Sequence, residues 1–174
     1  MSPDLAAPAA WLTGHADLLP RRGRALDVAC GRGRHALWLA ARGLDVVAID
    51  RDGEALAALA AEAAYRGVRV DTREGDLETS MPPLAADSFD VIVVVHYLHR
   101  PLFPRLRDAL RVGGVLVYET FTRAQARRGR PTNPAFLLEP GELTTLVTPL
   151  EVLARREGTF DEREVASVVA RRIG

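Results

Sequence analysis

The chain contains 174 residues, with 23 basic and 23 acidic side chains and a formal net charge of zero. This length predicts one domain with a sizeable core over residues 1–174, and it leaves no room for the separate substrate domain of a typical dehydrogenase. Because the net charge is zero, no overall field draws the chain to nucleic acid or to anionic membranes, and we expect neither as a partner.

The sequence favours a cytoplasmic location. It has no apolar stretch of membrane-spanning length. The first segment carries Asp4, Asp17 and three prolines, where a signal peptide would have a basic start and an apolar centre. A single cysteine, Cys30, cannot form an internal disulfide, which agrees with a reducing compartment.

Apolar strands and amphipathic helices alternate along the chain. Trp11, Leu12, Leu18 and Leu19 indicate a leading helix within residues 1–22. A strand, a turn, a helix over 35–42 and a second strand follow within segment 25–50. Further helices are predicted over 53–66, 102–111 and near Pro140, and further strands over 68–72, 91–95, 110–121, 150–155 and 165–172. This alternation predicts a parallel, doubly wound α/β sheet, whose ligands bind beyond the carboxyl ends of the strands.

A glycine turn joins the first predicted strand to the helix over 35–42. Gly31 and Gly33 let the backbone approach a ligand closely, and the helix that follows directs its first N–H groups to the same place. Asp50 ends the next strand, where a carboxylate can accept both hydroxyls of a ribose. The segment therefore predicts a nucleotide-type cofactor site.

Two cofactors fit this turn. Gly31, Gly33 and Ala36 satisfy the G-x-G-x-x-A pattern of dinucleotide-binding proteins, which would indicate an NAD-dependent oxidoreductase. Asp27 opposes that interpretation, because a dinucleotide strand normally carries only apolar residues at this place. A buried acid needs a partner, and either the glycine turn or a ligand's ammonium group would supply one.

The pattern D-x-x-C-G-x-G-R over residues 27–34 resembles motif I of the class I S-adenosylmethionine (SAM) methyltransferases. One departure is an alanine where that family has its first glycine. The resemblance implies that this motif contacts the cofactor, at its methionine end, through Asp27, Ala29, Gly31, Gly33 and Arg34. It also implies that Asp50 binds the ribose.

Three later segments match the same family in order. In EGDLE, Asp76 and Leu77 resemble the pair that reads the adenine amino group and packs against its ring. SFDVIVVVHYLHR resembles the fourth strand and its functional loop, and the resemblance places Val95 and His96 along the methionine backbone. LRVGGVLVYETF resembles the fifth strand. Among these enzymes, the chain is most similar to the small methyltransferases that include the tellurite-resistance enzymes.

The resemblance implies a single-domain, Rossmann-like sheet of seven strands, with an antiparallel last strand inserted beside the fifth. It implies SAM as cofactor, S-adenosylhomocysteine (SAH) as product, and in-line transfer of the sulfonium methyl group to a small-molecule acceptor. Such a reaction mainly needs alignment and exclusion of water. Two alternatives stay open: a SAM-binding regulatory protein without catalysis, and the oxidoreductase.

Candidate catalytic residues follow the fourth and fifth strands. His96 and His99 lie in the loop where the methyl group is expected, although they could be ordinary hydrogen-bonded loop residues. Their spacing could form half of a metal site, but no further ligands can be identified and no metal is expected. Tyr118 and Glu119 end the fifth strand and are candidates at the same edge, or partners of the next helix.

Residues 122–140 form a basic insertion, and its arginine-rich part, TRAQARRGRPTNP, contains no acid. We predict a lid that closes over an anionic acceptor through guanidinium groups; the alternative is a solvated loop. The residues expected to bind the acceptor are Tyr97, in the loop after the fourth strand, and the lid side chains Arg123, Arg127, Arg128 and Arg130.

Overall fold

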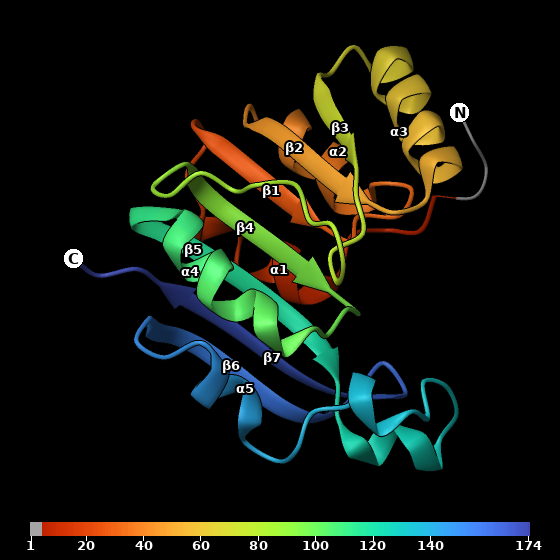
Figure 1. Ribbon diagram of the computed structural model, residues 1–174, viewed down its shortest axis with the longest axis vertical. Helices are drawn as coiled ribbons and strands as arrows, with labels where there is room; N and C mark the ends of the chain where they lie inside the picture. The colour runs from red at the N-terminus through yellow and green to blue at the C-terminus, as the bar shows by residue number, and fades with distance from the viewer. Residues whose placement is uncertain (1–4) are drawn as a thin grey trace.

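The computed structural model describes residues 5–174 and contains one seven-stranded sheet (Figure 1). The strand order is β3-β2-β1-β4-β5-β7-β6. The strands are β1 Arg24–Val28, β2 Asp45–Asp50, β3 Val70–Glu74, β4 Phe89–Val95, β5 Leu110–Phe121, β6 Glu151–Phe160 and β7 Arg163–Arg171. Strands β1 to β5 run parallel, and β7 is antiparallel to both of its neighbours. The predicted α/β class, the seven strands and the inserted last strand are confirmed.

Helices cover both faces of the sheet (Figure 1). They are α1 Ala10–Gly14, α2 Arg34–Ala41, α3 Gly53–Arg66, α4 Phe103–Ala109 and α5 Glu142–Leu146, with 3-10 turns η1 Ala16–Leu18, η2 Arg100–Leu102, η3 Arg123–Arg127 and η4 Pro134–Phe136. Helices α1, α2 and α3 share one apolar cluster with one face of the sheet, and α4 and α5 share a second cluster with the other. None of the helices in residues 5–174 is both long and apolar enough to cross a bilayer.

The core follows from the parallel pairing of the central strands. Strand β4 lies between β1 and β5 and is buried on both faces, so its residues 91–95 are a continuous apolar run instead of an alternating one. Strand β3, at one edge, has no fully buried residue. Helix α3 begins where Asp52 accepts the N–H groups of Glu54 and Ala55, and it ends at Gly67, whose φ is 68°.

Two predicted helices are shorter than expected. Within the described part of segment 1–22, only Ala10–Gly14 is α-helical, and residues 1–4 lie outside the described residues. Gly14 weakens a helix, and Pro20 has no N–H to continue one, so a single 3-10 turn leads into β1. The helix predicted over 102–111 ends at Ala109, because Leu110 already pairs with Phe89 as the start of β5.

The basic segment 122–140 is anchored at both ends beside β5. The N–H of Arg123 donates to the carbonyl of Leu138 at 3.0 Å, and the N–H of Leu138 donates to the carbonyl of Phe121 at 2.9 Å. Turns η3 and η4 lie between these two points. The segment therefore forms a closed loop at the carboxyl end of β5, next to the edge of the sheet where ligands bind in such folds.

Candidate functional site

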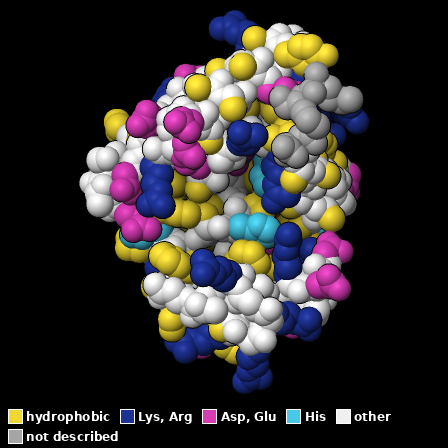
Figure 2. Space-filling model, turned by 90° about the vertical axis from the view of Figure 1, so that its right-hand side faces the viewer, with side chains coloured by type: hydrophobic (Ala, Val, Ile, Leu, Met, Phe, Trp, Pro, Cys, Tyr) yellow, Lys and Arg dark blue, Asp and Glu magenta, His cyan; other side chains and the backbone are white. Residues whose placement is uncertain are grey.

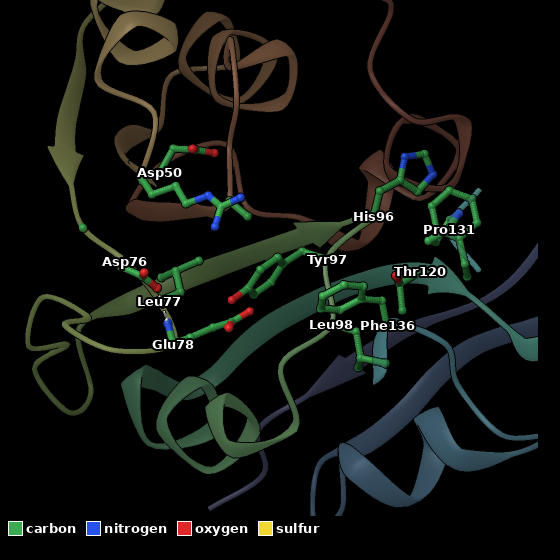
Figure 3. A pocket seen from close by; sticks show the side chains of 14 residues that line it. Asp50, Asp76, Leu77, Glu78, His96, Tyr97, Leu98, Thr120, Pro131 and Phe136 are labelled. Carbon is green, nitrogen blue, oxygen red and sulfur yellow. Dashed lines mark hydrogen bonds between the residues drawn. The ribbon is translucent and has the colours of Figure 1, made fainter. Parts of the chain in front are cut away.

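A cavity of about 390 Å³ opens at the carboxyl ends of the central strands, and Figure 2 shows the corresponding hollow on that side of the molecule. Its lining divides into two parts (Figure 3). We call the acidic half the part formed by Asp50, Arg51, Gly75, Asp76, Leu77 and Glu78. We call the apolar half the part formed by His96, Leu98, Thr120, Phe121, Pro131 and Phe136, and Ala29 and Tyr97 complete the lining.

Asp50 connects the acidic half to the glycine turn. Its Oδ2 accepts the N–H of Gly31 at 2.8 Å, and its Oδ1 accepts the N–H of Asp52 at 2.9 Å. Each carboxylate oxygen has two lone pairs, so both oxygens can still accept a ligand hydroxyl. The predicted ribose acceptor therefore lines the cavity with acceptor capacity to spare.

Asp76 and Leu77 follow β3 and also line the cavity. The Oδ1 of Asp76 accepts the N–H of Glu78 at 2.9 Å, and this hydrogen bond holds the pKa of Asp76 below its ordinary value. Leu77 is buried and offers an apolar surface beside the carboxylate. An ionised acceptor next to an apolar side chain suits an amino-substituted aromatic ring.

The two glycines of the turn, Gly31 and Gly33, are required for different structural reasons. A Cβ added to Gly31, at φ 53°, would meet no atom within 4 Å, so the space above this residue is open. A Cβ added to Gly33, at φ 78°, would lie 2.3 Å from Cδ1 of Leu59, and Gly33 does not line the cavity. Gly33 thus serves the packing of α2 against α3. Ala29 lines the cavity with φ 53°, a conformation that disfavours a Cβ.

Asp27 is buried below the turn and does not line the cavity. Its Oδ2 accepts the N–H of Ala36 at 2.9 Å, so it holds the first turn of α2. Burial raises the pKa of Asp27 to about 7. The sequence left two partners open for this acid, the glycine turn or a ligand's ammonium group. In the structure its partner is a backbone N–H next to the glycine turn. Arg34 also lies outside the lining and donates through Nη1 to the carbonyl of Ala7 at 2.9 Å.

Val95, the last residue of β4, is buried and does not line the cavity. The next residue, His96, lines the cavity at the point where β4 ends. Its φ is 57°, and its N–H donates to the carbonyl of Glu119 at 2.8 Å. The imidazole stacks on Phe121 with ring centroids 4.6 Å apart, and its Nε2 is buried without a hydrogen-bond partner in residues 5–174. Burial, followed by the charges of Arg163 and Arg34, lowers the pKa of His96 to about 4. The ring is therefore neutral at neutral pH.

Tyr97 and His99 take different positions from those expected. The Tyr97 side chain points toward Leu77 and Glu78, so it faces the acidic half (Figure 3). Burial, and then the charges of Glu78 and Asp76, raises the pKa of Tyr97 to about 12. His99 does not line the cavity, and its carbonyl accepts the N–H of Leu102 at the start of η2. Within residues 5–174 no group of three His, Cys, Asp or Glu side chains could hold a metal ion.

Tyr118 and Glu119 make hydrogen bonds within the fold and do not line the cavity. Tyr118 is fully buried, donates from its hydroxyl to the carbonyl of Tyr97 at 2.7 Å and stacks on Phe103. Burial raises the pKa of its hydroxyl further. Glu119 points to the other face, where it accepts from Arg156 at 3.0 Å and from Ser167 at 2.5 Å. Neither side chain lines the cavity, so the geometry favours the hydrogen-bonded interpretation over the catalytic one.

The four arginines of the predicted lid do not line the cavity. Nε of Arg123 lies 2.5 Å from Glu139, and Nε of Arg128 lies 2.7 Å from Glu164. Arg127 and Arg130 are exposed. Of the two acids, Glu139 lies near the end of the same segment, and the fold brings Glu164 to it from β7.

A protein-family model described as a methyltransferase domain matches residues 25–114, which is more than half of the sequence. The chain belongs to this methyltransferase family. The match covers the glycine turn, Asp50, Asp76 and the loop after β4, so the resemblance drawn from these motifs is confirmed. A comparison with curated protein sequences gives no match.

Solved structures show the same fold. TehB from Haemophilus influenzae aligns with a TM-score of 0.80 and 20% identity, covering 97% of this chain and 63% of that chain. A SAM-dependent methyltransferase from Mesorhizobium loti aligns with a TM-score of 0.73 and 21% identity, covering 94% and 98%. One from Methanosarcina mazei aligns with a TM-score of 0.75 and 18% identity, covering 92% and 97%. This methyltransferase domain thus spans 63% of the length of TehB.

SAM is the cofactor that the family implies, and the acidic half fits it. The open space above Gly31 leaves room for a ligand against the backbone. Asp50 retains lone pairs for two hydroxyls, and Asp76 with Leu77 offers a charged acceptor beside an apolar face. The cavity residues that the motifs did not identify are Arg51, Gly75, Glu78, Leu98, Thr120, Phe121, Pro131 and Phe136. Most of them, including Pro131 beside Arg130, adjoin a predicted residue or end a predicted strand, but Phe136 lies in a loop without any periodic signal.

Proposed function

We propose that this protein transfers the methyl group of SAM to a small-molecule acceptor. The observation that carries the proposal is the convergence of Ala29, Asp50 and Asp76 on one cavity, inside the segment that matches the methyltransferase family. The dinucleotide interpretation loses support, since the family match covers its G-x-G-x-x-A pattern.

The proposed roles follow from the chemistry of each group. Asp50 accepts the ribose hydroxyls, Asp76 accepts the adenine amino group, and Leu77 packs against the adenine ring. Bound SAM supplies a methyl group that is made electrophilic by the sulfonium. The residues of this chain contribute alignment of the two reactants and exclusion of water. No strong base faces the apolar half, since His96 is neutral and Glu119 is bound to Arg156.

Calorimetry with SAH tests the cofactor assignment. We expect a micromolar dissociation constant, about −8 kcal/mol. Replacing Asp50 with Ala should weaken binding by about 2 to 4 kcal/mol, because two charge-assisted hydrogen bonds are lost. Asp45→Ala is the matched control, since it removes an exposed carboxylate from the opposite end of the same strand.

Two results would contradict the cofactor assignment. The first is saturable binding of NADH to the wild-type protein with no heat from SAM or SAH. The second is unchanged SAH affinity in Asp50→Ala while thermal melting shows that the variant is folded. Formation of SAH from SAM during incubation with acceptors then separates a methyltransferase from a protein that only binds SAM.

We further propose the cytoplasm as the location and a small molecule, instead of nucleic acid or membrane, as the partner. The single cysteine, Cys30, is buried and suits a reducing compartment. The net charge of zero provides no overall attraction to polyanions. Cell fractionation with an antibody against the chain tests the location.

A further inference from the structure

The inference concerns the acceptor and rests on the proposed function. We propose that the apolar half binds a flat, apolar, aromatic acceptor, which is methylated on a soft nucleophilic atom, with sulfur of an aromatic thiol as the best match. The methyl acceptor predicted from the arginine-rich loop was an anion held by guanidinium groups. The structure favours a different chemistry for three independent reasons.

The first reason is the shape and composition of the lining. His96 and Phe121 stack with an interplanar angle of 22° and form a flat surface. Pro131 lies beside His96, and Phe136 lies beside Tyr97 and Leu98 (Figure 3). Phe136 is 44% exposed, which is unusual for a phenylalanine and places an apolar ring at the mouth of the cavity. Planar and apolar walls suit the faces of an aromatic ring.

The second reason is charge. Of the cavity-lining residues only Arg51 is cationic, and it belongs to the acidic half. The lid residues Arg123 and Arg128 are directed to Glu139 and Glu164. The lining of the apolar half therefore offers a strongly hydrated oxyanion no cationic side chain in place of its lost water, which is costly.

The third reason is the reaction itself. His96 is neutral and weakly basic, so the acceptor must reach the site with its nucleophile ready. An aromatic thiol meets this requirement by releasing its proton to water. The thiolate sulfur forms a bond to the methyl carbon as the bond from that carbon to the sulfonium breaks. The electron pair of the broken bond stays on the cofactor sulfur, and both products are neutral. A reaction that removes opposite charges is favoured in an apolar site, and it requires no oxidant or reductant.

The test uses 2-naphthalenethiol as the aromatic probe and selenite as the oxyanion probe, each titrated into the full chain saturated with SAH. We expect saturable binding of 2-naphthalenethiol and no binding of selenite at the same concentrations. Phe136→Ala should weaken binding of 2-naphthalenethiol by about three- to tenfold, because one aromatic contact is lost, and should leave SAH affinity unchanged. Tyr65→Ala is the matched control, since Tyr65 is an aromatic residue 71% exposed on α3 and outside the cavity.

A double variant, Arg127→Gln with Arg128→Gln, distinguishes the two acceptor classes. We expect it to bind 2-naphthalenethiol as the wild type does. With SAM in place of SAH, mass spectrometry should detect methyl 2-naphthyl sulfide. Selenite binding that the double variant loses, or thiol binding that Phe136→Ala leaves unchanged, would overturn the inference.

Failure of the proposed function gives a different result. If the wild type binds no SAH, the cofactor assignment is wrong, and the same thiol titration without cofactor then tests the apolar half alone. Binding that depends on Phe136 would support the aromatic site in that case too. Absence of thiol binding in a protein that does bind SAH would reject the aromatic acceptor and leave the cofactor assignment intact.

Discussion

The acidic and apolar halves of the cavity are built in different ways. The acidic half comes from residues at or just after the ends of neighbouring parallel strands, and Asp50 is held there by backbone N–H groups of the adjacent turns. The apolar half combines the loop after β4, the end of β5 and two residues of segment 122–140. The carboxyl ends of the strands fix the residues of the acidic half, whereas loops complete the apolar half. In this fold the proposed cofactor side is therefore fixed by topology, whereas the proposed acceptor side can change with loop sequence.

The largest expected effect concerns the glycine turn. Gly33→Ala should cost about 3 to 5 kcal/mol of unfolding free energy, because a left-handed φ and a clash with Leu59 add together. Gly31→Ala has the same kind of φ but open space, so it should cost about 1 kcal/mol of stability and instead weaken SAH binding. Urea denaturation and calorimetry on both variants check this. Equal loss of unfolding free energy in the two variants would contradict the expectation that only Gly33 is required for packing.

A smaller effect is expected from Asp27, beneath the same turn. Its folded pKa, about 7, lies above the ordinary aspartate value of 3.8, so it stabilises the fold below about pH 4 and this contribution is lost as the pH rises through 7. Asp27→Asn keeps an oxygen for the N–H of Ala36 and cannot ionise. It should be more stable than the wild type at pH 8 by about 2 kcal/mol, and equal to it near pH 4.

Thermal melting of wild type and Asp27→Asn across pH 4 to 8 measures that difference directly. In both proteins, two buried histidines change the stability with pH in the opposite direction. Their contributions are the same in both proteins, so they cancel when the two are compared. Burial lowers the folded pKa of His35 to about 3 and of His96 to about 4, so stability falls as pH drops below the ordinary histidine value. A stability difference that does not change with pH would mean that Asp27 does not titrate in this range.

The smallest expected effect tests the connection between the halves. Tyr118→Phe removes the hydrogen bond to the carbonyl of Tyr97 and should cost about 1 kcal/mol of unfolding free energy. Because Tyr97 lies between the two halves, the affinities for SAH and for the acceptor should both decrease slightly. Tyr65→Phe, at an exposed position of α3, is the control and should change neither. Loss of acceptor affinity alone would place Tyr97 with the apolar half.

The sequence predicted the elements whose signals are local. Apolar runs identified β1 and β4, while Gly67 marked the end of α3, and the structure has these elements within a few residues of the predicted places. The insertion of β7 beside β5 was expected only from the family resemblance, since hydrophobic patterns contain no strand order. The leading helix was overestimated because four apolar residues were assigned to one helix when Gly14 ends it.

The candidate site also contains residues that local sequence signals predicted and residues that they did not. Asp50, Asp76 and Leu77 all line the cavity, because motif spacing fixes strand ends. Tyr118 and Glu119 were expected beside it, but alternate residues of a strand point to opposite faces, and both faces of β5 are buried. The arginines looked unpaired because their acids are distant in sequence: Arg128 pairs with Glu164, 36 residues away. Long-range pairing of this kind leaves no local signal.

The position of β7 has a consequence for biosynthesis. Residues 165–171 pair with residues 115–121, so the outer edge of β5 has no partner until the second strand of the terminal hairpin has been made. The first five strands can associate earlier, since all their pairings lie within residues 24–121. An apolar strand with a free edge readily pairs with other chains. Nascent or truncated chains that lack residues 163–171 should therefore need chaperones, and aggregation during synthesis is the main hazard for this sheet.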